Sequence, residues 1–174
     1  LEVADAANAA FGVNPFGTHI GDHATDGHPG WDIEYRLGGT ARAAADGTVQ
    51  SVTPDQTTPG VSTIQIMHGT RFRTIYVNVG TLAAGVAAGA PVTKGQPLGI
   101  PAQRTQMIGS TLVTWAMIHF QLDDFTKSAG LTNKSAVNPG TYLSASGRAV
   151  FDTVFANASW GQEHPEWSVG LEQT

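Results

Sequence analysis

The chain has 174 residues, the length of one domain with a single core, and its 41% hydrophobic and 13% charged residues with 21 Gly and 9 Pro favour short strands joined by tight turns. Its formal charge is −5 and no basic run is interleaved with aromatic residues, which argues against a nucleic-acid partner. The absence of Cys excludes disulfides, thiolate metal sites and Cys nucleophiles, so any metal must be held by His and carboxylate groups.

The N-terminal region predicts little regular structure. Residues 1–10 are Ala-rich and favour a short helix, whereas residues 12–30 are dense in Gly, Pro, Asn, Asp and His and predict a loop. No apolar stretch in the sequence approaches the ~18 residues that a membrane-spanning helix needs. The chain begins at Leu1 rather than Met, so we expect a leader to have been removed.

The centre of the chain predicts a β-meander. Residues 40–53 look like two short strands around an Asp-Gly turn, and residues 62–68 and 71–79 alternate between apolar and polar side chains as half-buried strands do. Short strands are also expected on both sides of the Lys-Gly turn within residues 92–100. A last strong strand is expected over residues 112–122.

The C-terminal part predicts a short helix. Apolar residues at helical spacing favour a helix near residues 147–157, and the tail beyond position 159 has no clear period. No repeat of 20 to 50 residues is present. Taken together, these elements predict one mainly β domain over residues 1–174.

Three residues carry candidate metal chemistry. Zinc binds neutral imidazole nitrogen and carboxylate oxygen, and a catalytic zinc site uses three protein ligands with a fourth position left for water. His28, Asp32 and His119 would supply such a set. Pro29-Gly30 lets the chain bend so that the first two side chains converge, and His119 falls on an apolar strand, where a buried imidazole needs a partner.

Each half of this set also has a simpler explanation. A His-x-x-x-Asp match arises by chance in roughly a quarter to a third of chains with this many histidines. A single His on an apolar strand is more often a core residue hydrogen-bonded to a carbonyl than a metal ligand. The metal hypothesis therefore depends on the motifs that lie between the two halves.

Several motifs occur in one characteristic order along the chain. They are His28-Pro-Gly-Trp-Asp32, Ala44-Ala-Asp-Gly-Thr-Val49, Ile64-Gln-Ile-Met-His-Gly69, Gly89-Ala-Pro-Val-Thr-Lys-Gly-Gln-Pro-Leu-Gly99 and Met117-Ile-His-Phe120. In this order the chain resembles the lysostaphin-like or LytM-type zinc endopeptidases, which cut peptide cross-bridges in bacterial cell walls. The resemblance covers about residues 27–123, which makes residues 124–174 a C-terminal extension.

The resemblance implies a fold, a metal and a location. The fold would be a mainly β, antiparallel β-sheet cleft of the LytM/lysostaphin (duplicated hybrid motif) type with a short C-terminal helix. One zinc would be bound by His28, Asp32 and His119, and zinc-bound water would be the nucleophile. The partner would be a peptidoglycan peptide or cross-bridge. The location would be extracytoplasmic: secreted, periplasmic or associated with the cell envelope.

Two positions depart from the family's catalytic pattern. The family carries two histidines that handle protons and stabilise the tetrahedral intermediate, one in a Tyr-x-His segment and one at the start of His-x-His-Phe. Here these positions are Asn78 and Met117. A thioether cannot donate a proton, and a neutral carboxamide can orient an oxyanion but cannot act as a base near pH 7. Loss of such acid-base help typically costs about 10² to 10⁴ in rate.

Three nearby groups are candidates to replace the missing base. His23 and Asp26 lie in the polar loop just before the first metal ligand, and Glu34 follows Asp32 by two residues. The simpler explanation for the first two is that loop His and Asp residues usually face solvent or cap turns.

The remaining polar candidates have ordinary explanations. His19 and His164 lack any motif context, and His68 is expected to pack or hydrogen-bond at a strand end. Residues 92–99 also look like the turn of biotinyl and lipoyl carrier domains, or of sugar-phosphotransferase domains. However, Lys94 lies in the structural repeat rather than in a displayed hairpin, and phosphotransfer needs two close histidines where the framework offers one.

The sequence leaves two functions open. The first is a zinc-binding LytM-type peptidase-like domain that acts on bacterial peptidoglycan peptides with reduced activity or none, and the retained ligand set supports it. The second is a non-catalytic cell-wall-binding or regulatory domain that uses the same cleft to hold peptidoglycan or a protein partner. The loss of the catalytic histidines supports this second function.

Overall fold

The computed structural model describes residues 9–14, 16–17, 27–35, 37–108, 110–127 and 135–149, and this part of the chain forms a 10-stranded sheet. The strands are β1 (Ala9–Asn14), β2 (Trp31–Tyr35), β3 (Ala41–Arg42), β4 (Gly47–Pro54), β5 (Ser62–His68), β6 (Phe72–Leu82), β7 (Pro91–Val92), β8 (Pro97–Ile108), β9 (Thr111–Asp124) and β10 (Ala136–Val137). Their hydrogen-bonded order is β1-β2-β9-β8-β6-β5-β4-β7, with β10 on β9, β3 on β8 and a further pairing of β9 with β6.

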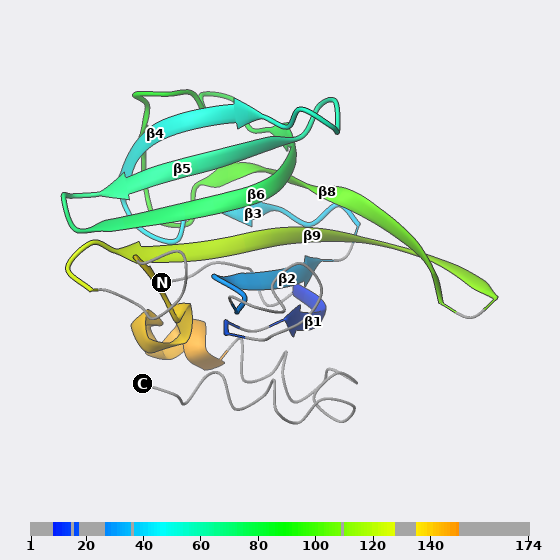
Figure 1. Cartoon of the computed structure of the whole chain (residues 1–174). Coiled ribbons are helices and arrows are strands. Elements are labelled where there is room, and N and C mark those ends of the chain that lie inside the picture. Colours follow the sequence, from blue (N-terminus) through cyan, green and yellow to red (C-terminus); the bar gives the residue numbers. More distant parts are fainter. Residues whose placement is uncertain are drawn as a thin grey trace.

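Strand β9 is the central element of this sheet. It runs through the middle of the molecule, with β2 and β1 below it and β6, β5 and β4 curling above it in the view of Figure 1. Every neighbouring pair is antiparallel. The prediction of a mainly β, antiparallel fold is therefore confirmed. No helix in the described part of the chain is long and apolar enough to cross a membrane.

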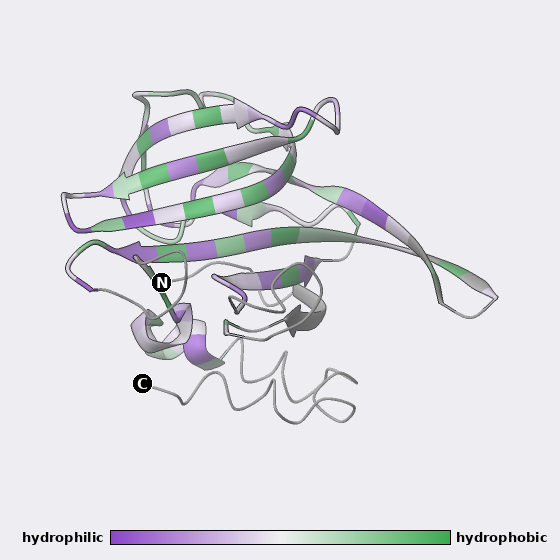
Figure 2. Cartoon of the chain, in the orientation of Figure 1, coloured by the Kyte–Doolittle hydropathy of each residue, from purple (hydrophilic) through white to green (hydrophobic). Residues whose placement is uncertain are grey.

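The central meander follows the predicted pattern. Along β5 the side chains of Ile64 and Ile66 are fully buried while their neighbours are partly exposed, and Figure 2 shows the matching alternation of apolar and polar residues. The turn that leads from β5 to β6 contains Gly69 at φ +64, a conformation that favours Gly. The predicted strands at 62–68 and 112–122 are confirmed as β5 and as part of β9.

The N-terminal prediction was wrong in part. Ala9 and Ala10, expected at the end of a helix, belong to strand β1, which also takes up residues 12–14 of the predicted loop. β1 pairs with β2, with Val13 opposite Ile33. Pairing with an existing sheet edge outweighs the weak helical preference of a few alanines. Residues 1–8 lie outside the described part of the chain.

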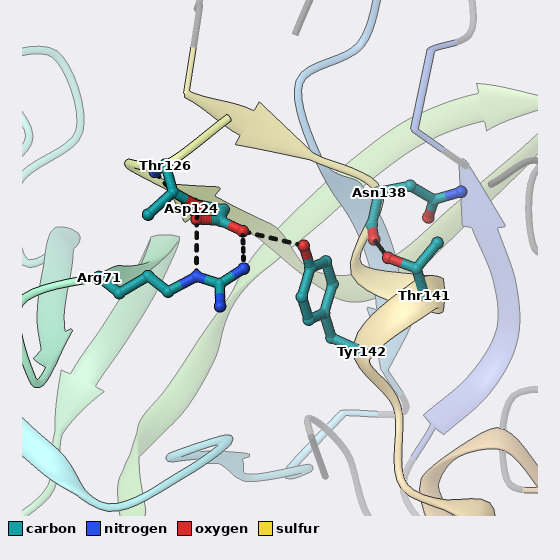
Figure 3. Close-up of polar contacts among 6 residues, drawn as sticks. All are labelled: Arg71, Asp124, Thr126, Asn138, Thr141 and Tyr142. Atoms are coloured by element: carbon teal, nitrogen blue, oxygen red, sulfur yellow. Dashed lines mark hydrogen bonds and ion pairs between the residues drawn. The ribbon is translucent and has the colours of Figure 1, made fainter. Parts of the chain in front are cut away.

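The C-terminal segment is held against the end of β9. Both Arg71 and Tyr142 bond the carboxylate of Asp124: the guanidinium donates to both carboxylate oxygens at 3.0 and 2.7 Å, and the Tyr142 hydroxyl donates to Oδ2 at 3.0 Å (Figure 3). Tyr142 ends the short 3-10 helix η2 (Pro139–Tyr142), whose N-cap Asn138 accepts from the Gly140 amide. Residues 145–149 are helical, so a short C-terminal helix is confirmed, while the rest of the predicted 147–157 helix lies outside the described residues.

The central strands have one buried face and one partly open face. Trp31, Ile33 and Tyr35 of β2 are fully buried, and so are Ile118 and Phe120 of β9. The residues between them, at positions 32, 34, 117 and 119, are only partly buried. Because side chains alternate along a strand, these intervening residues share the opposite face of β2 and β9. We call this the open face; the candidate site lies on it.

Candidate metal centre

Two adjacent strands bring the predicted metal ligands together. His28 lies just before β2, Asp32 is within β2, and His119 is within β9. The register of the β2–β9 pair places Asp32 directly opposite His119. Opposite side chains in an antiparallel pair share a face, so the long separation of these residues in the chain disappears in the fold.

The three ligand atoms lie almost at the spacing of a zinc tetrahedron. His28 Nε2 is 3.0 Å from His119 Nδ1 and 3.2 Å from Asp32 Oδ1, and the latter two atoms are 2.9 Å apart. Ligand atoms placed 2.0–2.1 Å from a central zinc would be about 3.3 Å from one another. Two imidazoles and one carboxylate are also a donor set that zinc uses. The residues present therefore fit a zinc ion in both chemistry and spacing.

Burial leaves one side of this cluster accessible. The His28 side chain is 1% exposed, whereas those of His119 and Asp32 are 15% and 27% exposed. Burial by itself would raise the pKa of Asp32, but hydrogen bonds from His119 and His28 outweigh it and hold that pKa below its usual range. Asp32 is thus ionised at neutral pH, as a metal ligand must be. A fourth ligand would approach from the accessible side.

Gly30 has a structural role that the sequence did not reveal. A Cβ atom built at this position would lie 2.3 Å from the carbonyl oxygen of Phe120 and 3.0 Å from His119 Nε2. The φ angle of Gly30 is not positive, so any residue could adopt its backbone conformation. Gly is required here because a larger side chain would not fit. Gly30 therefore lets the segment between His28 and Asp32 lie directly against β9. The bend expected from Pro29-Gly30 would not by itself require a Gly at this position.

The two positions that depart from the family pattern contact each other beside the cluster. Asn78 Nδ2 lies 3.5 Å from Met117 Sδ. Met117 shares the open face with His119, two residues further along β9. Asn78 is the only described residue other than Gly with a positive φ, at +69, a region where Asn is tolerated better than most residues. The two side chains thus form a pair at the place where the resemblance puts acid-base groups.

Of the three residues considered as replacements for the missing base, the structure describes only Glu34. Glu34 lies opposite Met117 in the β2–β9 register, and burial together with the charge of Asp32 raises its pKa to about 7. His23 and Asp26 lie outside the described residues, as do His19 and His164. Glu34 is therefore the one candidate that the described part of the chain brings beside the cluster.

His68 is part of the framework, as expected from the sequence. Its Nδ1 lies 2.7 Å from the carbonyl oxygen of Asp46 and its Nε2 lies 2.8 Å from the hydroxyl of Thr74. Both ring nitrogens are thereby engaged, one with the turn before β4 and one with β6. Lys94 lies in the turn between β7 and β8, and its backbone amide donates to Asp46 Oδ1 at 2.7 Å.

Comparison with solved structures identifies the fold. The chain is similar to a zinc-containing peptidase from Vibrio cholerae, with a TM-score of 0.54 and 18% identity over 79% of this chain and 37% of that chain. It is also similar to the antimicrobial peptidase lysostaphin from Staphylococcus simulans, with a TM-score of 0.54 and 18% identity over 80% of this chain and 54% of that chain. The catalytic domain of the prophage-encoded M23 protein EnpA from Enterococcus faecalis aligns with a TM-score of 0.51 and 22% identity, over 79% and 91% of the two chains.

The similarity to these solved structures shows that the chain has the fold of lysostaphin-like peptidases. Residues 26–139 match the family described as Peptidase family M23, and the chain belongs to that family. It spans 37% of the Vibrio peptidase and 50% of lysostaphin as solved in solution, well under two thirds of either protein. No curated protein matches the sequence.

Proposed function

We propose that this chain is a zinc-binding, LytM-type peptidase-like domain that acts on bacterial peptidoglycan peptides, with hydrolysis that is slow or absent. The observation that carries the proposal is the convergence of His28 Nε2, Asp32 Oδ1 and His119 Nδ1 on one point of the open face. In this proposal the three residues are zinc ligands and the accessible side of the cluster receives the peptide. A zinc ion held there would supply Lewis-acid activation of water and of a peptide carbonyl.

Slow hydrolysis is proposed because of the pair beside the cluster. The Asn78 amide can donate a hydrogen bond to an oxygen that becomes negative during the reaction, but it cannot accept and return a proton near pH 7. The thioether of Met117 can do neither. Groups that transfer protons usually contribute about 10² to 10⁴ in rate, and we propose that this chain lacks most of that contribution.

A second candidate function is a non-catalytic domain that binds the cell wall or regulates a protein partner. The contact of 3.5 Å between Asn78 Nδ2 and Met117 Sδ favours it, because the only polar group at the two former catalytic positions is directed to a sulfur atom. Under this function zinc would stabilise the fold and the face would bind peptide without cutting it. Measured hydrolysis of peptidoglycan separates the two candidates.

The wider setting is part of the same proposal. We propose one domain over residues 1–174, with a family-like core at about 27–123 and an extension at 124–174. A domain that acts on peptidoglycan works outside the cytoplasm, so we propose a secreted, periplasmic or envelope-associated location. The partner in this proposal is a peptidoglycan peptide and not nucleic acid, in keeping with the formal charge of −5.

Metal analysis of the purified chain tests the zinc site. After dialysis against buffer with trace zinc, mass spectrometry should find about one zinc per chain in the natural protein and none in His119→Ala. The matched control is His68→Gln. Both ring nitrogens of His68 bond framework groups, Asp46 and Thr74, and neither belongs to the cluster, so this change should leave the zinc content unchanged. Absence of zinc from the natural protein would overturn the proposal.

A further inference from the structure

Strands β8 and β9 continue beyond the rest of the sheet as a two-stranded arm. The pairing of β2 with β9 ends where Tyr35 meets Ala116, and the pairing of β6 with β8 reaches only to Pro101. Past these points β8 and β9 pair only with each other in the described part of the chain, out to Ile108 opposite Thr111. Figure 1 shows this arm projecting away from the sheet on the right. We call residues 103–108 and 110–115 the arm.

One face of the arm continues the face that carries the metal cluster. The pairings of β9 show no register shift between positions 111 and 124, so Trp115, Met117 and His119 lie on the same face. Arg104 is directly opposite Trp115 in the β8–β9 pair. Opposite residues have Cβ atoms about 4.5–5.5 Å apart, so Arg104 and Trp115 are cross-strand neighbours that share this face. Trp115 is half-buried and Arg104 is exposed.

Arg104 differs from the other arginines that the structure describes. Arg71 and Arg73 are paired with the buried carboxylates of Asp124 and Asp123. The remaining two donate to backbone carbonyl oxygens, Arg42 to Gly95 and Arg148 to Gly140. Arg104 has no hydrogen bond or ion pair with any described residue. Its guanidinium therefore keeps its full capacity to bind an external carboxylate in a bidentate manner.

We propose that Arg104 and Trp115 form a subsite for a carboxylate of the peptide held at the metal cluster, a proposal that rests on the proposed function. Four residues of strand separate positions 115 and 119, which corresponds to about 14 Å at ~3.4 Å per residue. An extended peptide lying along β9 covers this distance with about four residues. The subsite thus selects peptides that carry a free carboxylate about four residues from the bond over the metal cluster. The indole contributes apolar contact with the peptide chain on the way.

Binding of three alanine peptides to the full chain loaded with zinc tests this proposal by calorimetry. The neutral reference is acetyl-pentaalanine amide. One acidic probe has a free C-terminal carboxylate, and the other carries the carboxylate on an N-terminal succinyl group. One of the two acidic peptides should bind about tenfold more tightly than the reference, because an Arg–carboxylate pair is a strong charge-assisted interaction. Which one does so gives the direction of the bound peptide.

Variants assign the preference to the named residues. Arg104→Gln should remove the preference and leave binding of the neutral peptide unchanged. Trp115→Leu, which keeps an apolar side chain on the strand, should weaken all three peptides alike. The matched control is Thr105→Ala, because position 105 is exposed on the opposite face of the same strand and should change nothing.

The outcomes separate this proposal from the proposed function. Equal binding of all three peptides to a zinc-loaded protein overturns the carboxylate subsite alone, and so does a preference that survives in Arg104→Gln. A chain that holds zinc but binds none of the peptides likewise overturns the subsite. A chain that holds no zinc and binds no peptide contradicts the subsite and the proposed function together.

Discussion

Asp32 lies directly opposite His119 in the antiparallel pair β2–β9, and its Oδ1 atom is 2.9 Å from His119 Nδ1. The contact joins residues 87 positions apart. It depends on the register of one strand pair, because a slip by one residue would turn one of the two side chains to the opposite face. The geometry of the site is therefore set by the register of this one strand pair.

The carboxylate of Asp32 should be essential for metal binding. Asp32→Asn keeps the size of the side chain but removes the negative charge, so stoichiometric zinc should be lost. The control is Glu34→Gln, on the same strand and the same face, which should retain about one zinc per chain. Mass spectrometry of dialysed protein measures both. Equal zinc contents in the two variants would contradict the assignment of Asp32.

Replacement of Gly30 by a larger residue should reduce the stability of the protein, because there is no space for a side chain at this position. In Gly30→Ala the new methyl group would meet the Phe120 carbonyl at 2.3 Å and the His119 ring at 3.0 Å, so β2 and β9 must move apart. We expect a loss of about 1–3 kcal/mol in the free energy of unfolding, together with weaker zinc binding. Chemical denaturation measures the first and competition with a chelator the second. Pro29→Ala is the control, and a Gly30→Ala protein of natural stability would show that the two strands are less closely packed.

Histidines placed at positions 78 and 117, where the resemblance puts the catalytic pair, should raise hydrolysis. In the variant Asn78→His with Met117→His, proton-transfer groups return to the two positions, and His also tolerates the positive φ found at position 78. We expect peptidoglycan clearing to accelerate by roughly 10² or more over the natural chain. The control carries Asn78→Gln and Met117→Leu. If the variant with two histidines retains zinc but is no faster than this control, the explanation of slow hydrolysis is wrong.

The carboxylate of Asp124 should stabilise the fold in a pH-dependent way. Hydrogen bonds from Arg71 first, and from Thr126 and Tyr142, outweigh burial and hold the pKa of Asp124 below its usual value of 3.8. A group with a depressed pKa in the folded state contributes stability above the unfolded pKa and loses it as the pH falls through the folded pKa. Asp124→Asn should therefore lower the Tm by roughly 5 °C at pH 7, and this difference should shrink below pH 4. A difference independent of pH would contradict the ionic explanation.

Local patterns were sufficient to predict several of the central strands. The alternation over residues 62–68 indicated β5, and the apolar run at 112–122 indicated much of β9, because burial of one face acts directly on neighbouring residues. The pattern around residues 1–10 misled, since a strand edge contributed by β2 is not visible in the local sequence. The motif order singled out His28, Asp32 and His119 as candidate ligands through the resemblance that it carries, and imidazole and carboxylate are groups that bind zinc.

By itself, then, the sequence determined which groups are available: a His-Asp-His donor set without thiolates, a chain rich in short strands, and Asn78 and Met117 where acid-base groups were expected. Only the tertiary structure decided how these groups meet. The approach of Gly30 to Phe120, the contact between Asn78 and Met117 and the pairing of Arg104 with Trp115 all depend on strand register. Register is set by packing the whole sheet, since each strand must bury its apolar face against neighbours from distant parts of the chain.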